Sequence, residues 1–278
     1  MLINEELPVA EVTLLQGQED RYEGIIVAGD GLPDDPEEFS QRLDHSLKVW
    51  QEQERKGIWI KVPISKVGLV EVAVRKGFIF HHAEPNYVQI TRWLPATESK
   101  LPANASHQVG VGCFVLNEDN HVLVVQEKNG PLKGRGVWKM VTGLVDAGED
   151  INDAAEREVL EETGVKAKFA AVLALRQAHG FAFGKSDFFF VVALRPEPGQ
   201  TELVMQEDEL DAVAWMPLEE YAAVPFQSSR PILRQILDCC IAYAKGDYLG
   251  MTGMKLENGF KDRRDLLIHG EITRKSAL

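Results

Sequence analysis

Residues 1–95 change repeatedly between strand-like and helix-like patterns. Apolar side chains recur at helical spacing within 37–55, which predicts an amphipathic helix, and a second helix is expected over 66–76. Short apolar runs predict strands over 21–27, 58–62, 78–82 and 87–93. This order of elements predicts a small α/β layer, and the stretch 96–107, rich in Ala and Ser, is expected to be a linker.

Residues 108–245 predict a second, larger α/β region. Helices are expected over 150–163 and 230–245, and strands over 109–116, 121–126, 170–177, 188–194 and 212–216. The Asn- and Asp-containing segment 117–120 joins the first two strands and predicts a hairpin. The tail, 246–278, is rich in Gly and charged residues, and its pattern assigns no element to it.

Length and composition agree with two folded domains. The chain has 278 residues, and domains average about 150 residues. Hydrophobic residues make up 45% and charged residues 26%, as in soluble globular proteins. The longest apolar run, 188–194, is far shorter than the roughly 18 residues of a membrane span, so no membrane partner is expected.

The net charge and the N-terminal residues limit the partners and the location that can be expected. A net charge of −13 argues against a basic nucleic-acid-binding face, so no nucleic-acid partner is expected. Clustered carboxylates can instead hold a divalent metal, which attracts phosphate groups. The first residues lack the basic and apolar regions of a signal peptide, and three cysteines suit a reducing compartment, so a cytoplasmic location is expected.

Three glutamates share one face of the expected helix 150–163. Glu158 precedes Glu161 by three residues and Glu162 by four, a spacing that brings side chains together on a helix surface. Carboxylates this close repel each other unless a cation lies among them. A solvated acidic face is the ordinary explanation for such a group, so the glutamates alone do not establish a metal site.

A longer pattern surrounds these glutamates. Its fixed positions are Gly143, Glu149, Arg157, Glu158, Val159, Glu161, Glu162, Gly164 and Val165. These residues fill every fixed position of the Nudix box, and the chain therefore resembles the Nudix hydrolase superfamily. The resemblance implies an α/β/α sandwich around a mixed sheet, with the box forming a loop, a helix and a second loop. It also implies hydrolysis, dependent on Mg²⁺ or Mn²⁺, of a nucleoside diphosphate linked to another moiety.

The resemblance assigns roles to the residues of the box. Glu158, Glu161 and Glu162 would be metal ligands, joined by the carbonyl oxygen of Gly143, and hard oxygen ligands suit Mg²⁺. Arg157 and Glu149 match the pair that braces the box loop against the helix.

The catalytic base varies within the superfamily. Some members use a glutamate of the box, and others use a glutamate on a distal loop. Glu207 and Glu209 are the candidates for the second arrangement, and a plain acidic loop is the alternative explanation for both. Most superfamily members also have Pro where this chain has Val141 or Thr142.

Selectivity for a nucleobase comes from the shape of the pocket and from aromatic side chains that stack on the base. Trp138, Phe181 and Phe183 are the candidates for substrate binding, with Phe226 as a further one. A place in the hydrophobic core is the alternative for each.

The resemblance extends beyond the box. The segments that carry it are 56–61, 77–85, 94–95, 106–112 and 183–187. They are similar to the two-domain subgroup typified by plant ADP-ribose/NADH pyrophosphatases, over about residues 20 to 245. This likeness implies an acetyltransferase-like α/β domain before the Nudix domain, a homodimer, and ADP-ribose or NADH as the substrate, with AMP as a product. Trp50, Trp59 and Trp93 are many large apolar residues for so small a layer, which favours an interface on the first domain.

Other interpretations stay open. The chain could be a Nudix hydrolase for an oxidised nucleotide, a dinucleoside polyphosphate, coenzyme A or an isoprenoid diphosphate, or a binding protein with idle catalytic residues. His81, His82 and Glu84 could also be metal ligands. Adjacent residues of a strand point to opposite faces, so the two histidines are expected to pack or to form hydrogen bonds rather than to share an ion.

Overall fold

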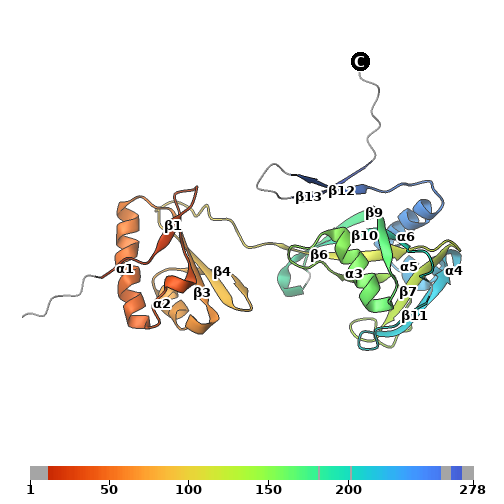
Figure 1. Ribbon diagram of the computed structural model, residues 1–278, viewed down its shortest axis with the longest axis horizontal. Helices are drawn as coiled ribbons and strands as arrows, with labels where there is room; N and C mark the ends of the chain where they lie inside the picture. Colours follow the sequence, from red (N-terminus) through yellow and green to blue (C-terminus); the bar gives the residue numbers. More distant parts are fainter. Residues whose placement is uncertain (1–11, 181, 201, 258–263, 271–278) are drawn as a thin grey trace, which may run out of the picture. The chain divides into compact units, whose positions relative to one another are not determined.

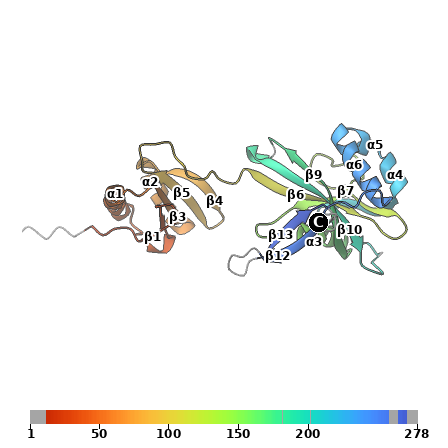
Figure 2. The same ribbon diagram turned by 90° about the horizontal axis from the view of Figure 1, so that it is seen from above.

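The chain forms two compact units, Met1–Ala105 and Ser106–Leu278. The computed structural model describes residues 12–180, 182–200, 202–257 and 264–270, and Figures 1 and 2 show the course of the chain. The division between the units lies inside the segment expected to be a linker. Among the described residues, no helix is both long enough and apolar enough to cross a membrane.

The first unit is a five-stranded sheet with two helices. The strand order is β1-β2-β3-β5-β4, in which only the β2–β3 pair is parallel. Its elements are β1 (Gly17–Glu19), β2 (Ile25–Val27), α1 (Pro36–Glu52), β3 (Gly57–Pro63), α2 (Leu69–Arg75), β4 (Ile79–Glu84) and β5 (Tyr87–Trp93). Short 3-10 turns span Gly29–Gly31 and Ile64–Lys66.

The helices of the first unit cover one face of its sheet. Asp35 starts α1 by accepting a 2.8 Å hydrogen bond from the backbone N–H of Glu38. Residues alternate along β3, so that Ile58 and Ile60 are fully buried in the core, whereas Trp59 is half-buried on the other side. The second face of the sheet therefore remains partly open to solvent.

The expectation that His81 and His82 point to opposite faces is wrong. The register of β4 against β5 shifts between Phe80 and His82, so His81 is an extra residue in the ladder. This irregularity removes the strict alternation of a regular strand. The Nδ1 atoms of the two histidines lie 2.7 Å apart, and the ring of His81 meets Trp59 edge to face.

The second unit contains a four-stranded mixed sheet, a two-stranded sheet and a terminal hairpin. The larger sheet has the order β8-β6-β10-β9, with β6 and β10 parallel, and the smaller sheet pairs β11 with β7. The strands are β6 (His107–Val115), β7 (His121–Glu127), β8 (Val141–Leu144), β9 (Ala167–Ala178), β10 (Ser186–Pro196), β11 (Leu210–Pro217), β12 (Thr252–Glu257) and β13 (Arg264–His269). The helices are α3 (Ile151–Thr163), α4 (Leu218–Ala223), α5 (Pro225–Ser228) and α6 (Pro231–Ala244).

The strands of the second unit lie between two helical layers. Val111 and Cys113 of β6 point into a core shared with Val159 of α3. The next residue along the strand, Phe114, points the other way into a separate core that contains Leu237 of α6. Figure 2 shows α3 and the group α4–α6 on opposite sides of the strands. This is the α/β/α arrangement around mixed strands that the resemblance to the Nudix superfamily implies.

The predicted hairpin at 117–120 is only partly present. A tight turn does form there, because the backbone N–H of Asn117 donates to the carbonyl of His121 at 3.0 Å. The two strands then separate: β6 pairs with β8 and β10, and β7 pairs with β11. A single bridge between Leu116 and Val122 remains of the ladder.

Candidate active site

The box forms a loop, a helix and a second loop around α3. Strand β8 delivers Gly143, the following loop carries Glu149, and α3 carries the other glutamates of the pattern. Gly164 ends the helix in the left-handed conformation, with φ +71°, which glycine adopts without steric cost. The buried residues Ala155 and Val159 attach α3 to the sheet and so set its orientation.

Arg157 lies at the centre of the hydrogen bonds of the box. Its Nε and Nη2 atoms donate to the two carboxylate oxygens of Glu149 at 2.8 and 2.9 Å, a bidentate pair that lowers the pKa of Glu149. Nη1 donates to Glu158 at 2.8 Å and to Glu161 at 3.2 Å. Nη2 also donates to the carbonyl oxygen of Leu144 at 3.0 Å. One guanidinium therefore joins the end of β8, the loop and the helix.

Glu158 packs directly under Gly143. A Cβ atom added to Gly143 would lie only 1.9 Å from Cδ of Glu158. The backbone of β8 can approach the carboxylate only because residue 143 has no side chain. Burial is the main cause that raises the pKa of Glu158, against the lowering effect of Arg157. The arrangement brings the carboxylate of Glu158 to the strand that carries the Gly143 carbonyl group.

Glu162 is buried, although it lies on a helix with many acidic residues. It is only 6% exposed, whereas the side chain of Glu161 is 55% exposed. Burial raises the pKa of Glu162 to about 7, with Glu158 adding to the rise and Lys139 opposing it. Its Oε2 atom is buried and has no hydrogen-bond partner. A buried carboxylate oxygen in this state has the capacity to bind a cation.

Two charged residues that the sequence reasoning missed lie near this carboxylate. Glu127, at the end of β7, forms a 2.6 Å ion pair with Lys139, and both act electrostatically on Glu162. Lys139 also donates to the hydroxyl of Thr142 at 2.6 Å. Thr142 stands in the region where most of the superfamily has Pro, so this departure supplies a hydrogen-bond acceptor for Lys139. The available signal was the polar Lys139-x-x-Thr142 spacing just before the box.

The candidate base Glu209 comes close to the box, although it precedes β11. Its charge contributes to the raised pKa values of both Glu158 and Glu162. Glu209 is exposed, and its backbone carbonyl accepts a 2.9 Å hydrogen bond from the backbone N–H of Lys128. Glu207 contributes its backbone carbonyl to a 2.6 Å hydrogen bond from Lys128 Nζ. The electrostatic effects therefore distinguish Glu209 from Glu207.

The candidate stacking aromatics differ in their surroundings. Trp138 is half-buried and packs against the core that α6 shares, and its carbonyl accepts a hydrogen bond from Gln227 at 3.3 Å. Phe183 is 98% exposed and has a positive φ of 55°, which is uncommon for a bulky residue. Phe226 is half-buried. Phe181 lies outside the described residues.

The C-terminal hairpin contacts the start of the box helix. Lys255 of β12 forms ion pairs with Asp150 at 2.8 Å and with Asp153 at 3.0 Å. Asp150 has the extended backbone of an N-cap residue, yet its side chain makes no capping hydrogen bond. The Asp150 side chain therefore contacts the tail, to which the sequence pattern assigns no element, instead of capping the helix.

The donor set of the box suits a hard divalent cation, and Arg157 hydrogen-bonds to two of its glutamates. As they lie, no three His, Cys, Asp or Glu groups within the described ranges form a metal cluster. Arg157 Nη1 occupies the space between Glu158 and Glu161. The unpartnered Oε2 atom of Glu162 and the close approach of Glu158 to Gly143 nevertheless supply oxygen donors from two adjoining elements.

Comparison with known proteins gives the class of the chain. A family model described as Nudix hydrolase domain matches residues 15–94, and one described as NUDIX domain matches residues 106–236. The chain belongs to the Nudix hydrolase family, and it is a pyrophosphatase-type hydrolase of the two-domain Nudix subgroup. Members of this family generally use divalent metals and act on nucleotide-linked substrates.

The sequence similarity to individual relatives extends over both units. Nudix hydrolase 2 of Arabidopsis thaliana is 46% identical over 260 residues, which cover 91% of this chain and 92% of that protein. Nucleoside diphosphate-linked moiety X motif 6 of Homo sapiens is 37% identical over 269 residues, covering 93% of this chain and 82% of the human protein. Among solved structures, a NUDIX hydrolase from Nitrosomonas europaea aligns with a TM-score of 0.39 at 22% identity, over 51% of this chain and 92% of that one.

Proposed function

We propose that this chain hydrolyses the pyrophosphate bond of ADP-ribose, NADH or both, with release of AMP, and that it requires Mg²⁺ or Mn²⁺. The observation that carries the catalytic part is the buried, unpartnered carboxylate oxygen of Glu162 beside Glu158 and Gly143. The nucleotide part is supported by family membership and by the resemblance to the plant two-domain pyrophosphatases.

The box residues would hold the metal. Glu158, Glu161, Glu162 and the carbonyl oxygen of Gly143 are the proposed ligands. When bound, a divalent metal neutralises phosphate charge and lowers the pKa of a water molecule. Arg157 positions these ligands, because it joins Glu149, Glu158 and Glu161 through one planar group. Binding would require the Arg157 contacts to Glu158 and Glu161 to loosen, while the bidentate pair with Glu149 can persist.

Glu209 is the proposed general base. Its carboxylate would take a proton from the attacking water, whose oxygen forms a bond to one phosphorus in line with the anhydride oxygen. The anhydride bond then breaks, and the nucleoside monophosphate leaves with the electron pair. Glu209 suits this role because it is exposed and yet close enough to act electrostatically on both Glu158 and Glu162.

Side-by-side hydrolysis of ADP-ribose, NADH and an oxidised guanine triphosphate with Mg²⁺ tests the proposal. We expect AMP from the first two substrates and little product from the third. Preference for the triphosphate would assign the chain to another Nudix substrate class. No metal-dependent turnover of any Nudix substrate would favour an idle binding protein and would overturn the proposal.

A further inference from the structure

The open face of the first unit contains a groove with aromatic walls. It has a volume of about 1090 Å³, slightly above the roughly 300–1,000 Å³ of typical small-molecule sites. Trp59 of β3, Trp93 of β5, Ile26 of β2 and His82 of β4 line it, together with Tyr22 from the turn between β1 and β2. Tyr22 is 74% exposed and Ile26 is 48% exposed, so apolar surface is accessible there.

The segment after β5 forms one wall of this groove. Leu101 packs into the space over Gly57, where a Cβ atom would lie 2.5 Å from its Cδ2 atom. The carbonyl oxygen of Pro102 lies 3.0 Å from Nε2 of His81, and the indole N–H of Trp93 donates to Thr97 at 3.3 Å. The segment is thus fixed against the sheet, and it brings Lys100 to the groove.

The acidic residues around the groove have partners in the part of the chain that the structure describes, whereas two of the basic residues do not. Both acidic residues have internal partners: Asp20 accepts from the backbone N–H groups of Tyr22 and Gly24, and Glu23 forms an ion pair with Lys56. Arg21 and Lys100 are exposed, and neither has an ion pair or a hydrogen bond among the described residues. The groove therefore presents two free cations beside aromatic rings.

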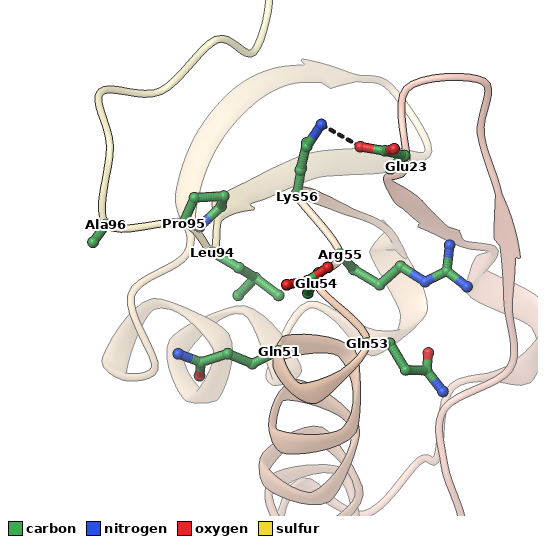
Figure 3. Close-up of a pocket in the computed structure, with 9 residues that line it drawn as sticks. All are labelled: Glu23, Gln51, Gln53, Glu54, Arg55, Lys56, Leu94, Pro95 and Ala96. Atoms are coloured by element: carbon green, nitrogen blue, oxygen red, sulfur yellow. Dashed lines mark ion pairs between the residues drawn. The ribbon is translucent and has the colours of Figure 1, made fainter.

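A neighbouring hollow lacks this combination. Its volume is about 630 Å³, and Figure 3 shows the Lys56–Glu23 ion pair among its lining residues. Both of these residues also line the groove. The remaining lining is Gln51, Gln53, Glu54, Arg55, Leu94, Pro95 and Ala96. It contains no aromatic ring, and Arg55 is already paired with Glu19. The hollow offers no surface on which a planar ligand could stack.

We propose that the groove binds a planar aromatic ligand that carries an anionic group, in chemical class a mononucleotide. The ring would stack on Trp59 or Trp93, because flat rings gain dispersion and π contacts on indole faces. The phosphate would be held by Arg21 and Lys100, whose charges complement it and have no competing partner. This site would be separate from the box, since every lining residue belongs to the first unit.

Fluorine NMR of the full chain labelled with 5-fluorotryptophan tests this proposal with AMP as the probe. The chain has five tryptophans, and single Trp→Phe variants assign their signals. We expect AMP to shift the Trp59 and Trp93 signals in a saturable way. Trp138 and Trp215 report separately on the second unit, so occupation of the box by AMP is distinguished from occupation of the groove. Adenosine and ribose 5-phosphate, which each lack one half of the recognised chemistry, should bind more weakly.

The double variant Arg21→Ala/Lys100→Ala is the decisive comparison. We expect it to weaken the AMP-dependent shift of Trp59 and Trp93 by about tenfold or more, with hydrolysis at the box unchanged. Lys48→Ala removes another exposed cation from the first unit, outside the groove, and should leave AMP binding unchanged.

Three results would overturn the proposal. The first is the absence of any AMP effect on Trp59 and Trp93, as when a second copy of the chain covers the groove. The second is an equal response in the double variant. The third is adenosine or ribose 5-phosphate binding as tightly as AMP.

Discussion

Glu162 and Glu161 occupy different environments although they are adjacent in the sequence. Glu162 is buried with one unpartnered oxygen, whereas Glu161 is exposed and touches Arg157. We expect Glu162→Gln to lower turnover by a factor on the order of 10² or more, because loss of metal charge stabilisation costs several kcal/mol. The replacement keeps the shape of the side chain, so the fold should survive. Steady-state hydrolysis of ADP-ribose measures the effect.

Glu156→Gln is the matched control for this variant. Glu156 lies on the same helix but pairs with Lys168 and lies outside the box pattern. Its replacement should leave turnover within a few-fold of the unmodified chain. Equal rates for all variants, including Glu161→Gln, would contradict the assignment of the box glutamates as ligands.

Metal binding should stabilise the folded chain as well as activate it. A ligand that binds only the native state adds about 2.7 kcal/mol at a concentration of 100 times its Kd. We expect Mg²⁺ or Mn²⁺ to raise the melting temperature of the unmodified chain, and chelation by EDTA to reverse this rise. Glu162→Gln should lose most of the metal-dependent increase. A rise of the same size in the variant would place the metal elsewhere.

Arg157 is a positioning residue whose geometry depends on its planar group. It donates to three carboxylates and to the Leu144 carbonyl at the same time. Lys has the charge but not the fork, so we expect Arg157→Lys to reduce kcat by about tenfold or more. Glu149→Gln should show a similar defect, since it breaks the same bidentate pair. Normal kcat in Arg157→Lys would show that charge alone positions the box.

The sequence predicts part of this site well and part of it not at all. The box residues are found because the pattern lies within one short stretch of the chain. Glu127 and Lys139 were missed because they approach Glu162 from β7 and from the segment before β8, and no local spacing encodes that approach. The burial of Glu162 was missed for the same reason, since a helical face shows which residues are neighbours but not what covers them.

The junction between β8 and α3 depends on the small size of Gly143. A Cβ atom there would lie 1.9 Å from Cδ of Glu158. We expect Gly143→Ala to displace Glu158 and to reduce both turnover and metal-dependent stabilisation severely. Gly68→Ala is the control, because a Cβ atom at that position meets no atom within 4 Å. Full activity of Gly143→Ala would mean that the strand and the helix can separate without loss of function.

Elements with a strong local pattern were predicted closely, and those that depend on distant partners were not. The expected helix 150–163 corresponds to α3, Ile151–Thr163, and the expected strand 87–93 corresponds to β5. The hairpin at 117–120 forms only its turn and one bridge, because the other partners of β6 come from distant parts of the chain. The register shift in β4 reversed the expectation for His81 and His82, since alternation assumes a regular strand.

At the scale of the whole molecule, the first unit offers an exposed strand edge. Strand β4 is the last strand in the order of its sheet, and Ile79 and Phe80 on it are each 64% exposed. Edge strands with apolar side chains are prone to pair with another chain. Trp50, by contrast, is only 5% exposed within the core of its own unit, so it needs no partner. The case for an interface therefore rests on β4 rather than on a surplus of tryptophans.

We propose that the protein is a homodimer formed through the first unit. A chain truncated to begin at Ser106 retains every box residue and should be monomeric in size-exclusion chromatography with light scattering. Phe80→Asp in the full chain should also give monomers, because a charge on the edge strand opposes apolar pairing. Glu84→Asp, on the same strand and also exposed, is the conservative control and should leave the dimer intact. A full-length chain that is monomeric at all concentrations would rule out the dimer, whereas a dimeric truncated chain would place the interface in the second unit.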